Sequence, residues 1–368
     1  MIISNLEIFN FRNYDNFKDE FSDKINIFIG DNAQGKTNLL EAIYITGTTK
    51  SFRKANPEKI IKFGEKNARI NAKITKNSIE KDIKIHYLSK NSKKIFINNK
   101  QIHKTSDYLG NLNITLFSPE ELNLIKGESS ERRNFLDSIL CQTDKLYLID
   151  LINYYKIIKQ KNYLLKEKKH NRDLKKELEP WNIQIAEYAS KIVIKRLKFL
   201  ENNRKSILSI HDKLTSNEKM DIKYIDKAEG QEVEEDKYKK NFISKQKEII
   251  VEEIKRGFSL LGPHRDKIEI NINGYNTRFF SSQGQQRTAA ITLKLAEIEY
   301  IYLILKEYPI LLLDDVFSEL DDKRQEYIIN FLNKDIQIFI TGAKQADFIA
   351  LFPKAKIFEV KSGKVTKS

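Results

Sequence analysis

The sequence of 368 residues predicts an α/β protein in which a long helical segment interrupts a sheet-based domain. Strand and helix patterns alternate at both ends of the chain, which is typical of a parallel sheet covered by helices. The middle of the chain instead repeats apolar residues at helical spacing. The third observation is a glycine-rich loop over residues 30–37, between a strand and a helix, which indicates phosphate binding. At roughly 150 residues per domain, the length allows about two domains.

The composition is that of a basic globular protein. Lys and Arg number 65 against 51 Asp and Glu, so the net charge is +14 and an acidic partner such as nucleic acid or a membrane surface is possible. Hydrophobic residues make up 40% and charged residues 32%, which argues against a chain disordered throughout. Cys141 is the one cysteine, so we expect neither a disulfide nor a cysteine zinc site, and a reducing cytoplasm is the expected location. The sequence contains no stretch of about 18 consecutive apolar residues, so no membrane span is predicted.

The first third of the chain is predicted to be rich in strands, because apolar residues recur there at spacing two. The last two of these strands resemble a meander. Strands are predicted over residues 2–9, 24–29, 68–75, 80–88 and 94–97, with a turn at Asn98 and Asn99.

The chain changes from strand to helix at Ser118. Ser118, Pro119 and Glu121 form an N-cap pattern, so a helix is predicted to begin there. Residues 144–213 predict a helical hairpin broken at Pro180, with limbs of about 30 residues, or about 45 Å each. Residues 230–236 are acidic and predict an exposed loop.

The predicted hairpin carries much of the basic charge. Residues 153–213 contain sixteen Lys or Arg and seven Asp or Glu, so +9 of the net +14 lies there. Two interpretations stay open, a basic arm that contacts an acidic partner and a solvated hairpin whose lysines keep it soluble.

The last third of the chain returns to an alternating pattern. Asn273 and Gly274 form a hairpin turn signal between two predicted strands. A long apolar helix and two further strand and helix pairs follow, so the two ends of the chain are predicted to be halves of one domain. Strands are predicted over 267–272, 275–280, 310–313 and 336–340, and helices around 293–301, over 322–332 and from Gln345.

Three segments carry residue types suited to nucleotide chemistry. Residues 30–37 match the pattern GxxxxGK[ST], in which Lys36 reaches the β- and γ-phosphate oxygens and the Thr37 hydroxyl ligates magnesium. Asp314 and Asp315 end an apolar strand, where one carboxylate binds magnesium and a second can orient water. Residues 281–287 combine a serine, a glycine and a helix N-terminus, which suits a γ-phosphate.

In this order, the segments resemble the heads of ABC-type ATPases, and specifically the RecF family in their SMC-like branch. The resemblance runs from one end of the chain nearly to the other, although residues 144–255 show no matching motif. The matching segments are 10–14, 32–42, 117–120, 132–137, 262–266, 282–288 and 313–321.

The resemblance implies an α/β ABC-type ATPase head, a P-loop NTPase, with a β-rich N-terminal subdomain and an inserted α-helical arm. Its expected parts are residues 1–117 and 256–368 of the head and 118–255 of the arm. It implies that two heads close over two molecules of ATP and Mg²⁺ in an ATP-dependent homodimer, in which Ser282 and Gly284 act on the partner's nucleotide.

The resemblance also assigns roles to residues. Lys36 and Asp315 are the expected catalytic residues, and Thr37 and Asp314 the expected metal ligands. Because Asp315 replaces a longer glutamate, we expect slow hydrolysis that DNA stimulates. The expected nucleotide-binding residues are Arg12, Asn13, Gly30, Asp31, Asn32, Ala33, Gln34, Gly35, Lys36, Thr37, Ser282, Gly284 and Gln285.

The function implied is DNA replication and recombinational repair. Such a protein binds double-stranded or gapped DNA, including junctions of single and double strands, and helps RecR- and RecO-type mediators load recombinase at single-strand gaps. Gln283 and Thr341 differ from the usual transporter residues and disfavour the alternative, an ATPase subunit of a membrane transporter. A scaffold with a vestigial ATP site is a third possibility. His264 is expected to be a structural, hydrogen-bonding histidine.

Overall fold

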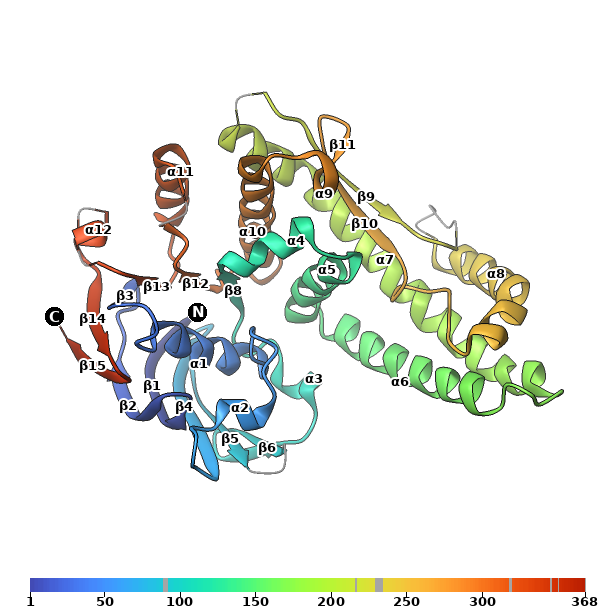
Figure 1. Cartoon of the computed structure of the whole chain (residues 1–368), viewed down its shortest axis with the longest axis horizontal. Coiled ribbons are helices and arrows are strands. Elements are labelled where there is room, and N and C mark those ends of the chain that lie inside the picture. Colours follow the sequence, from blue (N-terminus) through green and yellow to red (C-terminus); the bar gives the residue numbers. More distant parts are fainter. Residues whose placement is uncertain are drawn as a thin grey trace. The chain divides into compact units, whose positions relative to one another are not determined.

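The computed structural model describes residues 1–88, 92–215, 217–228, 234–317, 320–344, 346–349 and 351–367. The chain divides into two compact units, one made of residues 1–121 and 297–368 and the other of residues 122–296. Figure 1 shows their helices and strands. The sequence-based division ended the insertion at residue 255, whereas residues 256–296 belong to the second unit. The segment around Ser282 is therefore part of that unit.

The first unit contains a six-stranded antiparallel sheet in the order β2-β1-β4-β5-β6-β7. The predicted turn at Asn98 and Asn99 joins β6 to β7, and both residues have the positive φ that a tight turn requires. The strands are β1 (Ile2–Phe11), β2 (Tyr14–Glu20), β4 (Asn67–Lys76), β5 (Ile79–Leu88), β6 (Ser92–Ile97) and β7 (Lys100–Ile102).

A second sheet of the same unit is mostly parallel and combines strands from both ends of the chain. Its order is β15-β14-β3-β13-β12-β8, and its β14–β15 pair is antiparallel. The mixed α/β prediction is thus confirmed, because β3 lies between β13 and β14, two strands from the far end of the chain. The strands are β3 (Ile25–Ile29), β8 (Ile114–Phe117), β12 (Ile310–Asp314), β13 (Ile338–Gly342), β14 (Lys356–Lys361) and β15 (Lys364–Lys367).

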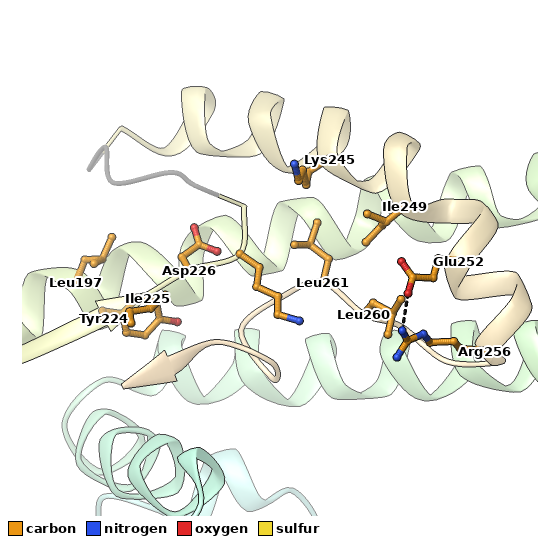
Figure 2. A pocket seen from close by; sticks show the side chains of 11 residues that line it. Leu197, Tyr224, Ile225, Asp226, Lys245, Ile249, Glu252, Arg256, Leu260 and Leu261 are labelled. Atoms are coloured by element: carbon orange, nitrogen blue, oxygen red, sulfur yellow. Dashed lines mark ion pairs between the residues drawn. The ribbon is translucent and has the colours of Figure 1, made fainter. Parts of the chain in front are cut away.

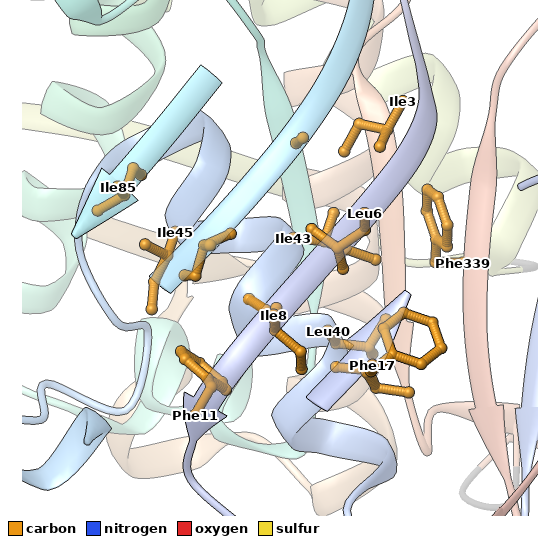
Figure 3. Close-up of a cluster of buried hydrophobic side chains, with 14 of the residues drawn as sticks. Ile3, Leu6, Ile8, Phe11, Phe17, Leu40, Ile43, Ile45, Ile85 and Phe339 are labelled. Carbon is orange, nitrogen blue, oxygen red and sulfur yellow. The ribbon is translucent and has the colours of Figure 1, made fainter. Parts of the chain in front are cut away.

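Helix α1 (Lys36–Thr48) packs into the core of the first unit. Figure 3 shows Leu40 and Ile43 of α1 among Leu6 and Ile8 of β1, with Phe339 of β13 in the same cluster. All five side chains are completely buried. At about 1.5–3 kcal/mol for each fully buried side chain, this packing holds the N-terminus of α1 in place. The remaining helices of the unit are α2 (Pro57–Ile60), α3 (Thr105–Tyr108), α11 (Asp322–Leu332) and α12 (Ala346–Ile349).

The second unit is mostly helical. Figure 1 shows α6 (Lys145–Glu167) and α7 (Leu174–Leu214) lying alongside one another, with α8 (Glu235–Arg256) on α7. A three-stranded antiparallel sheet in the order β11-β10-β9 completes the unit. Its other elements are α4 (Asn123–Lys126), α5 (Ser129–Thr143), β9 (Met220–Ile225), β10 (Lys267–Ile272), β11 (Tyr275–Asn276), α9 (Thr277–Phe280) and α10 (Gln283–Leu305), whose last residues belong to the first unit.

The predicted break at Pro180 is wrong. Pro180 lies inside α7, one turn and a half from its start, and the hairpin turns earlier, between Glu167 and Leu174. Asn171 and Glu177 stabilise the turn, since the Asn171 side chain accepts from the Asp173 amide and donates to Glu177. The limbs are therefore unequal, with 23 residues in α6 and 41 in α7.

A helix begins after Ser118, as predicted; its first turn is a 3₁₀ helix over Pro119–Leu122, and α4 follows it directly. One further local prediction needs correction. The strand predicted over 275–280 ends at Asn276, because its side chain accepts from the Arg278 amide and so begins helix α9. The helix predicted from Gln345 is described only over Ala346–Ile349, and most of the predicted acidic loop lies outside the described residues.

Candidate nucleotide site

The loop between β3 and α1 has the conformation that its glycines allow. Gly30 has φ of 147° and Gly35 has φ of 119°, values that residues with a Cβ rarely adopt. A Cβ on Gly30 would lie 2.3 Å from the Val360 carbonyl oxygen, and a Cβ on Gly35 would lie 2.8 Å from the Asn13 and Tyr14 side chains. Both positions therefore require glycine.

Lys36, the first residue of α1, folds back over this loop. Its Nζ donates to the carbonyl oxygens of Gly30 and Asp31, the latter at 2.9 Å. Burial lowers the pKa of the Lys36 ammonium, while the charges of Asp315, Asp31 and Asp314 oppose that shift. A phosphate in the loop would offer this ammonium a stronger, charged acceptor.

Two carboxylates, those of Asp314 and Asp315, lie at the carboxyl end of β12, an interior strand of the parallel sheet. The Asp314 Oδ1 atom accepts from the Thr37 hydroxyl at 2.9 Å and from the Thr341 hydroxyl at 2.8 Å. Burial raises the pKa of Asp314, since its charged form is poorly solvated. A carboxylate and a threonine hydroxyl are oxygen ligands of the kind that Mg²⁺ prefers, and a divalent cation would favour the ionised form of Asp314. Thr37 and Asp314 therefore fit a magnesium ion.

A cavity of about 340 Å³ lies between the loop and these strand ends. It brings together the predicted Lys36, Thr37 and Asp315 with Thr341, which was not among the predicted site residues. Its remaining lining residues are Asn32, Ala33, Gln34, Gly35, Asn38 and Arg53.

Arg53 and Asn38 are residues of the cavity that the sequence analysis missed. The Arg53 guanidinium donates to the Asn38 side-chain oxygen at 2.8 Å and lies 3.9 Å from the Glu41 carboxylate. Arg53 lies in the segment between α1 and α2, beyond the phosphate-loop pattern, so that pattern did not indicate it. Asn38, in the first turn of α1, is one residue past the pattern.

Asn13 contacts the phosphate loop, whereas Arg12 contacts helix α1. The Asn13 side chain donates to the Gln34 carbonyl at 3.0 Å and accepts from Asn38 at 2.8 Å. The Arg12 guanidinium makes a two-point contact with the buried Glu41 carboxylate, at 2.8 and 2.6 Å, and a third bond to the Lys59 carbonyl. Neither residue lines the cavity. Their direct contact with nucleotide stays a prediction.

The predicted signature segment begins helix α10 in the second unit. The Ser282 hydroxyl accepts from the backbone N–H of Gln285 at 3.2 Å, and the side-chain oxygen of Gln285 accepts from the backbone N–H of Ser282 at 2.9 Å. This reciprocal pair is a capping box. Gly284 is exposed, and a Cβ there would meet only the Ser282 hydroxyl, at 3.9 Å. The segment is thus an ordered, accessible helix N-terminus. Ser318 and Glu319, part of the matching segment 313–321, lie outside the described residues.

His264 makes a side-chain hydrogen bond, as predicted. Its Nδ1 atom lies 2.5 Å from the Tyr154 hydroxyl, and burial lowers its pKa to about 3. The adjacent Pro263 carbonyl accepts from Arg196, which also pairs with Asp137 in the interior. The motif around His264 therefore joins α6 and α7 of the second unit.

A larger cavity of about 680 Å³ lies in the second unit, between α7, β9 and α8. Figure 2 shows its lining, in which the Arg256 guanidinium pairs with Glu252 of the same helix at one end, at 2.6 Å. The hydroxyl of Tyr224, another lining residue, bonds to Arg196 and Asp266. None of the predicted site residues lines this cavity. Its volume alone does not make it the nucleotide site.

The basic charge of the helical hairpin is partly structural. The buried Lys161 ammonium pairs with Glu253 at 2.6 Å, and the buried Arg196 pairs with Asp137. Surface pairs also form, such as that of Lys195 with Asp144. The net charge of +9 over residues 153–213 therefore overstates the cationic surface that a partner would meet.

Among the residues that the structure describes, no helix is both long enough and apolar enough to cross a membrane.

Comparison with known proteins finds full-length similarity. The family model described as the RecF/RecN/SMC N terminal domain matches residues 2–366. The chain is 41% identical to the DNA replication and repair protein RecF of Bacillus cytotoxicus, over 99% of this chain and 98% of that protein. It is 42% identical to RecF of a Bacillus cereus strain, over 93% of this chain and 92% of that protein.

Solved structures agree with these sequence matches. The recombination mediator protein RecF with ATPrS, from the RecFOR pathway, superposes with a TM-score of 0.92 at 36% identity, over 100% of this chain and 98% of that one. An Smc head bound to the C-winged helix domain of ScpA superposes with a TM-score of 0.58 at 15% identity, over 100% and 98% of the two chains, and shares the fold.

Proposed function

Because the chain belongs to the RecF family, we propose that it is an ATPase of DNA replication and recombinational repair that binds DNA when ATP closes a dimer of its heads. The single observation that carries the proposal is the cavity that joins Lys36, Thr37 and Asp315 on an ATPase-head fold. The relatives are DNA replication and repair proteins, so the transporter alternative has no support.

ATP is the proposed substrate. Structures of RecF relatives carry ATP or ATPrS, at 35% and 36% identity to this chain. The amide groups of the glycine-rich loop and the N-terminus of α1 suit the phosphates, since both present N–H donors to an anion. Lys36 would leave its two carbonyl partners and contact the β- and γ-phosphate oxygens.

Hydrolysis is proposed to use Asp315 as the base. Water would attack the γ-phosphorus and lose a proton to the Asp315 carboxylate, while the bond from the γ-phosphorus to the bridging oxygen breaks and ADP leaves. Thr37 and Asp314 would hold Mg²⁺, which neutralises phosphate charge when it is bound. The shorter reach of aspartate than of glutamate supports slow turnover.

Ser282 is proposed to act on the nucleotide of a second copy. The capping bond uses the Ser282 oxygen as an acceptor, so the hydroxyl hydrogen stays available to donate to a γ-phosphate oxygen. The amide groups at the start of α10, including that of Gly284, would add further donors. Gln285 would act mainly through the cap, because its amide nitrogen already donates to Glu218 at 2.9 Å.

DNA is the proposed macromolecular partner, and the cytoplasm the proposed location. The net charge of +14 favours a polyanion. The RecFOR pathway named for the solved relatives supports RecR- and RecO-type mediators as protein partners at single-strand gaps.

DNA-stimulated hydrolysis tests the proposal. We expect the wild-type protein to hydrolyse ATP slowly and several-fold faster with a gapped duplex, measured as phosphate release. Asp315→Asn should bind ATP but lose at least tenfold in rate, because an amide does not accept the proton. Asp322→Asn, an exposed carboxylate in α11, is the matched control. Equal rates for wild type and Asp315→Asn would contradict the assigned base.

A further inference from the structure

Thr341 occupies a position in the sheet that couples both acidic residues of the site. Strand β13 runs parallel to β12, in a register that places Thr341 opposite Asp314. On its other side β13 pairs with β3, the strand that leads into the phosphate loop. Only 1% of the Thr341 surface is exposed, so the side chain is fixed by its packing.

The Thr341 hydroxyl makes one bond to each of the two acidic residues. It donates to Asp314 Oδ1 at 2.8 Å and accepts from the Asp315 backbone N–H at 2.9 Å. A hydroxyl has one hydrogen to give and lone pairs to receive, and both capacities are used here. Asp315 has φ of 53°, a left-handed conformation that costs energy for a residue with a Cβ. The bond to its amide holds that conformation.

Thr37 completes the arrangement around Asp314. Its hydroxyl donates to the same Oδ1 atom at 2.9 Å. Because this bond uses the Thr37 hydrogen, the lone pairs of its oxygen face away from Asp314 and can ligate a cation. Two hydroxyls on one carboxylate oxygen thus set the rotamer of Asp314.

We infer that Thr341 is a positioning residue that orients the Asp314 carboxylate for Mg²⁺ and fixes the backbone of Asp315. The inference rests on the proposed function, and it assigns to Thr341 a role in magnesium affinity that does not require contact with nucleotide. Groups that hold a metal ligand in place typically change metal affinity by about 10–100-fold when they are removed. Removal of this hydroxyl should have an effect of that size.

The test is a magnesium titration monitored by binding of a fluorescent ATP analogue. We expect Thr341→Val to need at least tenfold more Mg²⁺ than wild type for half-maximal binding, while binding of the analogue in excess EDTA is unchanged. Thr341→Ser keeps the hydroxyl and should stay within about threefold of wild type. Thr341→Ala also lacks the hydroxyl and serves as the second variant if Thr341→Val does not fold.

A matched control distinguishes the loss of any buried hydroxyl from the loss of the Thr341 hydroxyl. Thr46 is also completely buried, but its hydroxyl donates within α1, to the Ala42 carbonyl. Thr46→Val should titrate with Mg²⁺ as wild type does. If folded Thr341→Val or Thr341→Ala requires the same Mg²⁺ concentration as wild type, or loses binding equally with and without Mg²⁺, the inference is overturned and the proposed function stands. If the wild-type protein does not bind the analogue, both fail.

Discussion

Lys36 is the residue on which nucleotide binding depends most directly. Lys36→Ala removes an ammonium that lines the cavity, and a hydrogen bond to a charged group contributes about 1.5–3 kcal/mol. We therefore expect affinity for the fluorescent ATP analogue to fall by at least tenfold. Lys18→Ala, at a side chain that is 69% exposed on β2, is the control and should bind as wild type does. Equal binding by Lys36→Ala and wild type would place the nucleotide elsewhere.

Asp266 gives the second unit a pH-dependent stability. Burial, with a contribution from Asp226, raises its pKa to about 6, while bonds from Tyr224 and the charge of Arg196 oppose the shift. The folded state thus holds this proton more tightly than the unfolded state, so stability from Asp266 falls as pH rises from about 4 to about 6.

Asp266→Asn tests this effect, because it removes the titration. The difference in free energy of unfolding between variant and wild type should change by about 3 kcal/mol across that range, measured by urea denaturation at several pH values. Asp236→Asn, on the exposed start of α8, should follow wild type at every pH. A pH-independent difference for Asp266→Asn would show that the carboxyl titrates normally.

At the scale of the element, helix α7 contains a proline that its stability does not need. Pro180 has no N–H to donate to the Lys176 carbonyl and is exposed. Pro180→Ala should raise the free energy of unfolding by about 1 kcal/mol or more, measured by urea denaturation. Glu179→Ala, its exposed neighbour, should change it by less than about 0.5 kcal/mol. A loss of stability in Pro180→Ala would mean that the proline shapes α7.

Elements were predictable from the sequence where local signals and packing agree. Helix α11 has the predicted bounds of 322–332, because Asp321 caps it and its apolar residues face the core. Pro180 misled the prediction, since the long apolar face of α7 outweighs one missing hydrogen bond. The side chain of Asn276 ended a strand that alternation alone would have continued.

The site was predictable only in part. The phosphate loop and the acidic strand end have fixed spacings, so Lys36, Thr37 and Asp315 were found from the sequence and now line one cavity. Arg53 lines the same cavity because the segment after α1 folds back toward the phosphate loop, and no local sequence pattern predicts that path of the chain. The ion pair between Arg12 and the buried Glu41 likewise depends on tertiary packing, which no local pattern predicts.

At the scale of the whole molecule, charge governs the proposed contact with DNA. If about six phosphates are contacted, affinity for a gapped duplex should fall about a thousandfold between roughly 50 and 200 mM salt, and depend little on base sequence. Lys161 and Arg196 form buried ion pairs and cannot contact phosphates. The dependence of DNA affinity on salt concentration should therefore reflect the exposed lysines rather than the full charge. A slope equivalent to one phosphate contact would argue against a DNA clamp.

The central claim, an ATP-gated dimer that binds DNA, is tested most directly by fluorescence anisotropy of a labelled gapped duplex. The duplex is titrated with wild-type protein and with the Ser282→Arg variant, each with ATP, with ADP and without nucleotide. Because Ser282 lies at an exposed helix N-terminus, the variant should fold, but its arginine side chain should block contact with a second copy. We predict that ATP tightens DNA binding by the wild type and that Ser282→Arg loses this gain. DNA binding that is absent, or equal under all three conditions, would contradict the claim.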